Sequence, residues 1–149
     1  MISEIIEKHS SIDVLVNVVG GYLGGKSVSE LEEQERDIMV NLNLKSAFLI
    51  SKHVIPIMMS AKYGKMVHVS SRTALKSDGY DCAYAASKSG LIRLIESISQ
   101  EVKESNINVN CIMPSIIDTV MWLKQQSQIQ RGLFCNLSNS LVCSALEYG

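Results

Sequence analysis

The sequence predicts an α/β protein built on a doubly wound parallel sheet with helices on both of its faces. Two observations carry this expectation. Short runs of β-branched and other apolar residues, which are typical of buried strands, alternate with long segments of helical periodicity. The order strand, helix, strand, helix, strand occupies residues 12–113. This alternation indicates β-α-β units joined by right-handed crossovers.

Three segments are expected to be strands. Residues 12–19 (IDVLVNVV) form a nearly continuous apolar run, which is interrupted only by Asp13 and Asn17 and ends at two glycines. Such a run suits a strand that is buried on both faces, as in a parallel sheet. Residues 65–69 (KMVHV) and 108–113 (NVNCIM) are shorter apolar strands, and a proline follows the second of them.

Two segments are expected to be helical. Residues 29–61 open with Ser-Glu-Leu-Glu, a possible capping box, and continue with helical apolar spacing as one long helix or two abutting ones. Residues 82–105 place apolar side chains on one broad face. The members of that face are Ala86, Leu91, Leu94, Ile95, Ile98 and Val102.

Composition excludes several functional classes. The chain has 149 residues, of which 46% are hydrophobic and 19% charged, as expected for a globular domain with a proper core. Its net charge of -1 gives no basic surface for nucleic acid or for an anionic membrane. No apolar run reaches the ~20 residues that would cross a bilayer.

The cysteines and histidines do not indicate a metal site. The four cysteines have no CxxC spacing, and the three histidines are far apart in the sequence. The first residues do not resemble a secretory signal, so we expect reduced thiols in a cytoplasmic protein.

Polar residues follow each expected strand. Asn17 and Gly20 come after the first strand, Ser70 and Ser71 after the second, and residues 115–119 after the third. Ligands of open parallel sheets bind outside the carboxyl ends of the strands. We therefore expect a binding site at this edge of the sheet.

A tyrosine and a lysine stand four residues apart in the stretch YAASKSG, at Tyr84 and Lys88. This spacing places both side chains on one face of a helix, although the pair alone is a weak signal. An ammonium group near a phenol favours the phenolate, which suits acid–base catalysis. A serine hydroxyl beside them could hold a substrate oxygen, and strand alternation and spacing favour Ser71 over Ser70 for that role.

These residues resemble the active-site signature of the short-chain dehydrogenases/reductases. Tyr84 and Lys88 form the YxxxK motif, and Ser71 stands thirteen positions before the tyrosine. The segment VNLNLKSAF resembles the helix that carries the family's catalytic asparagine, at the position of Asn41. The segment NVNCIMPSIIDT resembles the strand and loop that close over the nicotinamide. The likeness runs from about residue 12 to residue 119.

The resemblance implies a partial Rossmann-type domain and a catalytic set of four residues. Tyr84 would be the general acid/base, and Lys88 would favour its ionised form and bind the nicotinamide ribose. Ser71 would orient the substrate oxygen. Asn41 would hold a water that links Lys88 to a proton relay.

The resemblance also implies a cofactor and partners. The reaction would be hydride transfer between NAD or NADP and a small carbonyl compound or secondary alcohol. The two long helices could pair across a homo-oligomer. The residues implied in cofactor binding are Asn17, Gly20, Tyr84, Lys88, Ile117 and Thr119.

The sequence departs from the family pattern in three places. It contains no GxxxGxG or GxGxxG motif, so we expect an N-terminally truncated member that lacks the glycine-rich cofactor loop, and NAD cannot be told from NADP. The family's NNAG motif reads Asn-Val-Val-Gly at residues 17–20. The likeness ends at Thr119, which predicts a domain over residues 1–119 and a divergent tail over residues 120–149.

Two functional interpretations follow from these departures. The first is an NAD(P)-dependent oxidoreductase with a Tyr/Lys/Ser/Asn active site. The alternative is a catalytically inactive fragment that acts at most as an interaction or dimerisation subunit. The uncharged stretch at residues 132–146 suggests the hypothesis that the tail is a truncated or frame-shifted reading of a longer gene.

Overall fold

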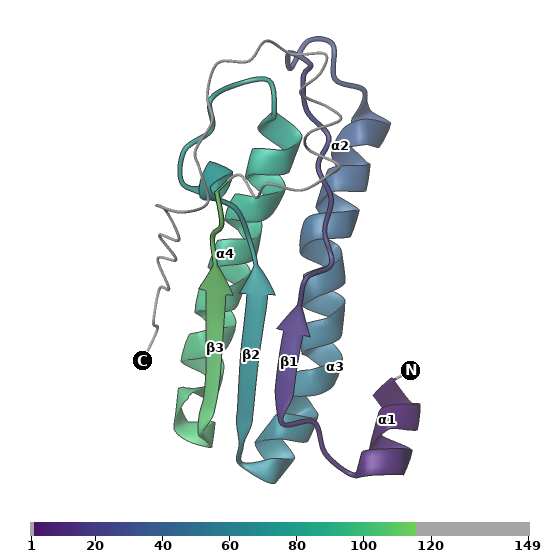
Figure 1. The fold of residues 1–149 in the computed structure, drawn as a ribbon, viewed down its shortest axis with the longest axis vertical. Helices are drawn as coiled ribbons and strands as arrows, with labels where there is room; N and C mark the ends of the chain where they lie inside the picture. Colours follow the sequence, from purple (N-terminus) through teal and green to yellow (C-terminus); the bar gives the residue numbers. More distant parts are fainter. Residues whose placement is uncertain (1, 116–149) are drawn as a thin grey trace, which may run out of the picture.

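The fold was analysed in a computed structural model, which describes residues 2–115. The helices and strands follow one another in the predicted alternation (Figure 1). In chain order they are α1 (Ile2–His9), β1 (Val14–Asn17), α2 (Glu33–Val40), a π-helical turn (Asn41–Lys45), α3 (Ser46–Ala61), β2 (Gly64–Val69), α4 (Cys82–Val102) and β3 (Ile107–Ile112), with short 3-10 turns at Arg72–Ala74 and Lys103–Ser105.

The three strands form one parallel sheet in the order β1-β2-β3. In the register of the sheet, Val16 pairs with Val67, and Val67 pairs with Asn110. Figure 1 shows α3 and α4 lying behind these strands, with all three carboxyl ends at the same edge. The predicted α/β class, with a parallel sheet and helices packed against it, is confirmed.

The long helices pack against one face of the sheet. Met66 and Val109 point to this face and join a core with Met58 of α3 and Leu91 of α4. Side chains that point to the opposite face remain more accessible, and Val16 is 60% exposed. Within residues 2–115, the expected helices on both faces are therefore found on one face only.

The first long helical segment begins later than predicted. The capping box lies at Glu32 and Glu35, whose backbone and side-chain groups bond each other reciprocally, and not at Ser29. Ser29 belongs instead to the turn before the helix. From Glu33 to Ala61 the chain is helical throughout, so the two abutting helices are joined by the π-helical turn.

The second helical segment has most of the apolar face that its periodicity predicts. Leu91, Ile95, Ile98 and Val102 are buried in the core, and Leu94 packs against it. Ala86 is exposed, so its assignment to this face was wrong. The helix itself ends at Val102, and a 3-10 turn continues to residue 105.

A histidine is buried in the centre of the sheet between two polar partners. Asn17 Nδ2 lies 3.1 Å from His68 Nδ1, and His68 Nε2 lies 3.4 Å from Ser51 Oγ. The amide nitrogen can only donate, so Nδ1 accepts and the Nε2–H group donates to the serine. Burial lowers the pKa of His68 to about 4. The imidazole is thus held neutral and ties β1, β2 and α3 together.

This burial predicts a pH-dependent stability. The unfolded chain takes up a proton at His68 near pH 6.5, whereas the folded chain does so only near pH 4. Stability is therefore full above pH 6.5 and falls as the pH drops towards 4. Between pH 7 and pH 5 the free energy of unfolding should decrease by about 2 kcal/mol. Urea denaturation at both pH values measures it. A His68→Gln chain should lose this part of the slope, and an unchanged slope would contradict the assignment.

Candidate active site

The candidate site lies at the carboxyl ends of the strands, where α4 begins. Its central group is the Lys88 side chain, which is only 5% exposed. Lys88 Nζ donates to the Val69 carbonyl at 2.8 Å, at the end of β2. Burial lowers the pKa of Lys88. The ammonium is therefore fixed against the end of the central strand.

Tyr84 lies one helical turn before Lys88 on the same face of α4. The Lys88 Nζ atom is 6.0 Å from the centroid of the Tyr84 ring. Tyr84 is half-buried and lines a cavity of about 270 Å³ together with Ser71 and Ser115. The structure thus brings Tyr84 and the predicted serine to one cavity, and the Lys88 ammonium lies beside the tyrosine ring.

The two serines that follow β2 have different surroundings. Ser70 is buried, and its Oγ donates to the Lys88 carbonyl at 2.9 Å. Ser71 is half-buried, and its Oγ accepts from the Thr73 N–H at 3.2 Å. That contact leaves the Ser71 hydroxyl hydrogen able to donate to a ligand. The geometry therefore favours Ser71 as the serine that meets a substrate, as its spacing predicts.

The asparagine whose side chain contacts other residues of the candidate site is Asn43, and not the predicted Asn41. Asn41 is exposed, whereas Asn43 is fully buried in the π-helical turn. Asn43 Oδ1 accepts from the Gly21 N–H at 3.0 Å, and its Nδ2 donates to the Gly21 carbonyl at 3.0 Å and to Ser87 Oγ at 3.2 Å. The π-helical turn directs residue 43, not residue 41, towards α4.

Gly20 is packed directly against the polar groups of the site. A Cβ atom at this position would lie 2.8 Å from Asn43 Oδ1 and 3.0 Å from Lys88 Nζ. Neither neighbour can move freely, because both side chains are held by hydrogen bonds. The position therefore requires glycine, whose backbone lies directly beside the Lys88 ammonium.

Asn17 is not among the residues that line the cavity. Its side chain is buried beneath the edge of the sheet, where it contacts His68 and accepts from the Val19 N–H at 3.2 Å. Through its hydrogen bond with the Val19 N–H, Asn17 stabilises the turn that leads to Gly20. The predicted residues Ile117 and Thr119, and the predicted boundary at residue 119, lie outside the described residues.

Sequence reasoning missed Tyr22, which also lines the cavity. Its ring is perpendicular to that of Tyr84, with an angle of 83° and a centroid distance of 4.9 Å. Burial of the phenol, followed by the nearby carboxylate of Asp81, raises the pKa of Tyr22. The available signal was an aromatic residue two positions after Gly20, in a loop at the polar edge of the sheet.

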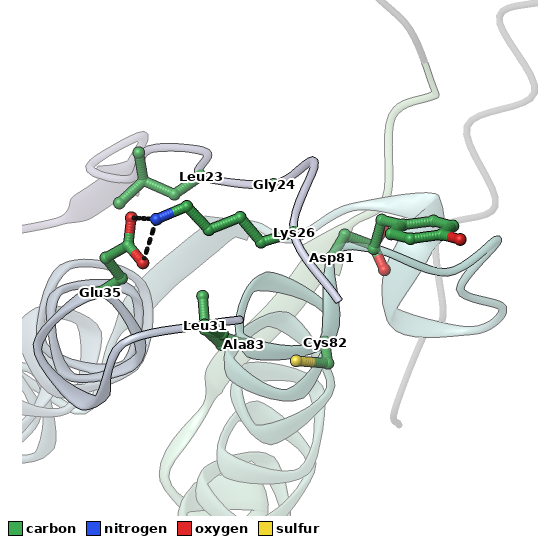
Figure 2. Close-up of a pocket in the computed structure, with 9 residues that line it drawn as sticks. Leu23, Gly24, Lys26, Leu31, Glu35, Asp81, Cys82 and Ala83 are labelled. Carbon is green, nitrogen blue, oxygen red and sulfur yellow. Dashed lines mark hydrogen bonds and ion pairs between the residues drawn. The ribbon is translucent and has the colours of Figure 1, made fainter. Parts of the chain in front are cut away.

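A second hollow lies between the loop at residues 23–26 and the beginnings of α2 and α4 (Figure 2). Its volume is only about 40 Å³. The Lys26 ammonium contacts both carboxylate oxygens of Glu35 at 2.8 Å, as Figure 2 shows. The polar groups of this hollow thus satisfy each other, and we assign no ligand to it.

Residues 2–115 contain no group of three His, Cys, Asp or Glu side chains that could hold a metal ion. No helix in this part of the chain is long and apolar enough to cross a membrane.

Comparison with known proteins shows the family to which the chain belongs. The family model described as short chain dehydrogenase matches residues 1–130. The 3-oxoacyl-[acyl-carrier-protein] reductase FabG of Thermotoga maritima is 33% identical over 81% of this chain and 49% of its own length. The (2S)-[(R)-hydroxy(phenyl)methyl]succinyl-CoA dehydrogenase subunit BbsD of Thauera aromatica is 33% identical over 82% of this chain and 48% of its own.

A solved structure gives the same result for the fold. The structure titled ElxO with NADP bound superposes with a TM-score of 0.81 at 28% identity, covering 85% of this chain and 51% of that one. The chain belongs to the short-chain dehydrogenase family. It spans about half the length of the curated relatives it matches.

The two asparagines of the π-helical turn provide a matched test of the site. Asn43→Ala leaves the Gly21 backbone groups without partners and opens a small cavity, so it should reduce the free energy of unfolding by about 1–3 kcal/mol. Asn41→Ala changes an exposed side chain and should alter it by less than about 0.5 kcal/mol. Urea denaturation measures both. Equal effects of the two substitutions would contradict the assignment of Asn43.

Proposed function

We propose that this chain carries the acid–base half of an NAD(P)-dependent oxidoreductase that interconverts a carbonyl compound and a secondary alcohol. One observation carries the proposal: the Tyr84 and Ser71 side chains line one cavity, and the buried Lys88 ammonium lies beside the tyrosine ring. A structural lysine has little reason to be buried at this place, because desolvation penalises its charge.

Each residue has a distinct role in the proposed reaction. The Ser71 hydroxyl donates to the substrate oxygen and holds the carbonyl carbon in place. The Tyr84 hydroxyl delivers the proton to that oxygen in reduction and removes it in oxidation. The Lys88 ammonium stabilises the tyrosinate electrostatically. Asn43 takes the position expected of Asn41 and holds the loop at Gly21 against the site.

The residues present fit the nicotinamide end of a dinucleotide. Gly20 offers backbone without a side chain beside Lys88, and the ammonium has donors beyond the one that Val69 accepts. We propose that Gly20, Tyr84 and Lys88 contact the nicotinamide and its ribose, together with Ile117 and Thr119. When bound, NAD or NADP would supply or accept the hydride. The sequence has no glycine-rich phosphate loop.

The substrate is proposed to be a small carbonyl compound or secondary alcohol in the cytoplasm. The names of the relatives differ here, since one is a 3-oxoacyl reductase and another is the dehydrogenase of a hydroxy(phenyl)methyl compound. Their shared feature is a carbonyl or hydroxyl group on a carbon chain. The Ser71 and Tyr84 hydroxyl groups would act on that group alone, which supports the class and leaves the remainder of the substrate open.

The second candidate function is that of a non-catalytic interaction subunit. The observation in its favour is the exposed β1 strand at the edge of the sheet, where Val14 and Val16 are both more than half exposed. Pairing across a homo-oligomer through the long helices is supported by the exposed side chains of Phe48, Leu49 and Met59 on α3.

Cofactor binding separates the two functions. Titration of the chain into NADH and NADPH should change the nicotinamide fluorescence if the chain is an oxidoreductase. Absence of binding to either at millimolar cofactor would leave only the interaction subunit.

Substitution of the proposed acid tests the chemistry. Tyr84→Phe keeps the ring but removes the transferable proton, so turnover of a carbonyl substrate should be lost while cofactor affinity stays largely intact. Tyr80→Phe, which removes a hydroxyl from an exposed loop tyrosine, is the matched control and should retain turnover. Equal loss of affinity and rate in Tyr84→Phe would count against the role of Tyr84.

A further inference from the structure

Tyr22 presents an aromatic surface to the cavity that the proposed chemistry does not use. Its side chain is 54% exposed although its ring contacts Tyr84. Among the described residues, no hydrogen bond to the Tyr22 hydroxyl is formed. Tyr22 is therefore not a buried core residue, and its hydroxyl group does not hold it in place through a hydrogen bond.

The simplest structural explanation for Tyr22 is that it anchors its loop, but the loop is anchored by other groups. Asn43 bonds both backbone groups of Gly21, the residue before Tyr22. The Gly25 N–H donates to the Tyr80 carbonyl at 2.7 Å, three residues after Tyr22. With the backbone held on both sides, the exposed ring is available for contact with a ligand.

The two rings form an aromatic corner, by which we mean the perpendicular pair Tyr22 and Tyr84. Lys88 occupies a position over the Tyr84 ring, so the accessible ring of the corner is that of Tyr22. A flat group that stacks on Tyr22 would lie beside the Tyr84 ring and in the same cavity as Ser71. Such ring pairs prefer offset-stacked and perpendicular arrangements, and this corner offers both.

We propose that Tyr22 is a specificity-determining residue, and that the cavity selects substrates with an aromatic ring bonded to the carbonyl or carbinol carbon. This inference rests on the proposed function for the identity of the reacting group. The aromatic ring of such a substrate would stack on Tyr22 while its oxygen reaches Ser71 and Tyr84. The phenol of Tyr22 stays uncharged, because burial and Asp81 raise its pKa, so the stacking surface does not change with pH near neutrality.

A pair of ketones of similar size tests the proposal without any cofactor. Acetophenone carries a phenyl group on the carbonyl carbon, and cyclohexyl methyl ketone carries a saturated ring in the same place. Their dissociation constants are measured by NMR titration of the full chain with labelled tyrosine rings. Acetophenone should bind roughly 2- to 10-fold more tightly and should shift the signals of Tyr22 and Tyr84.

Four variants separate stacking from other effects. Tyr22→Phe keeps the ring and should keep the preference, and Tyr22→Leu should abolish it. Gly24→Ala keeps the tyrosine but displaces it, because a Cβ atom at Gly24 would collide with the end of the Tyr22 ring. It should reduce the preference even if Tyr22→Leu does not fold. Tyr63→Leu removes an exposed tyrosine elsewhere and should change nothing.

Three results would overturn the proposal. They are equal dissociation constants for the two ketones, an aromatic preference that survives in both Tyr22→Leu and Gly24→Ala, and no shift of the Tyr22 signals at tens of millimolar ketone. Failure of the proposed function appears differently, as absence of NADH and NADPH binding. Because the ketone titrations contain no cofactor, the failure of one proposal is distinguished from the failure of the other.

Discussion

The hydrogen bond between the Lys88 ammonium and the Val69 carbonyl is the interaction on which the site depends. It joins the first turns of α4 to the carboxyl end of the central strand, and Ser70 makes a second connection by donating to the Lys88 carbonyl. A buried ammonium is costly unless its donors are satisfied. The position of the Lys88 ammonium therefore constrains the polar groups around it. It also requires that residue 20 be a glycine, because a Cβ atom there would lie too close to Nζ.

Asn43 extends this constraint to the loop after β1. It bonds the N–H and the carbonyl of Gly21 and also contacts Ser87, one residue before the lysine. The loop, the π-helical turn and α4 are thus connected through one side-chain amide. Residues that touch the cavity are therefore supported by a shell of hydrogen bonds, which is how a site keeps its geometry.

Much of this arrangement could be predicted from sequence, because it depends on regular periodicity. The strand and helix alternation predicted the parallel sheet. The spacing of Ser71, Tyr84 and Lys88 predicted residues that do lie together, since Ser71 and Tyr84 line one cavity and the Lys88 ammonium lies beside the Tyr84 ring. The structure exposes the predicted Asn41 and buries Asn43, because residues 41 and 43 lie on different sides of a helix. To choose between them, one must know where the π-helical turn begins and which way its side chains point, and the spacing of apolar residues does not reveal this. Tyr22 lies in a loop, where no periodicity indicates direction.

The π-helical turn also determines how the side chains of α2 are oriented around the helix axis relative to those of α3. A π turn acts as one additional residue within an α-helix, and one residue corresponds to a rotation of about 100° around the helix axis. Removing a single residue from Asn41–Lys45 would replace the wide π turn by a regular α-helical one and change which side chains of this turn face α4. The chemistry at residue 43 is thus linked to the length of the helix, so an insertion or deletion in this turn has greater consequences than most substitutions.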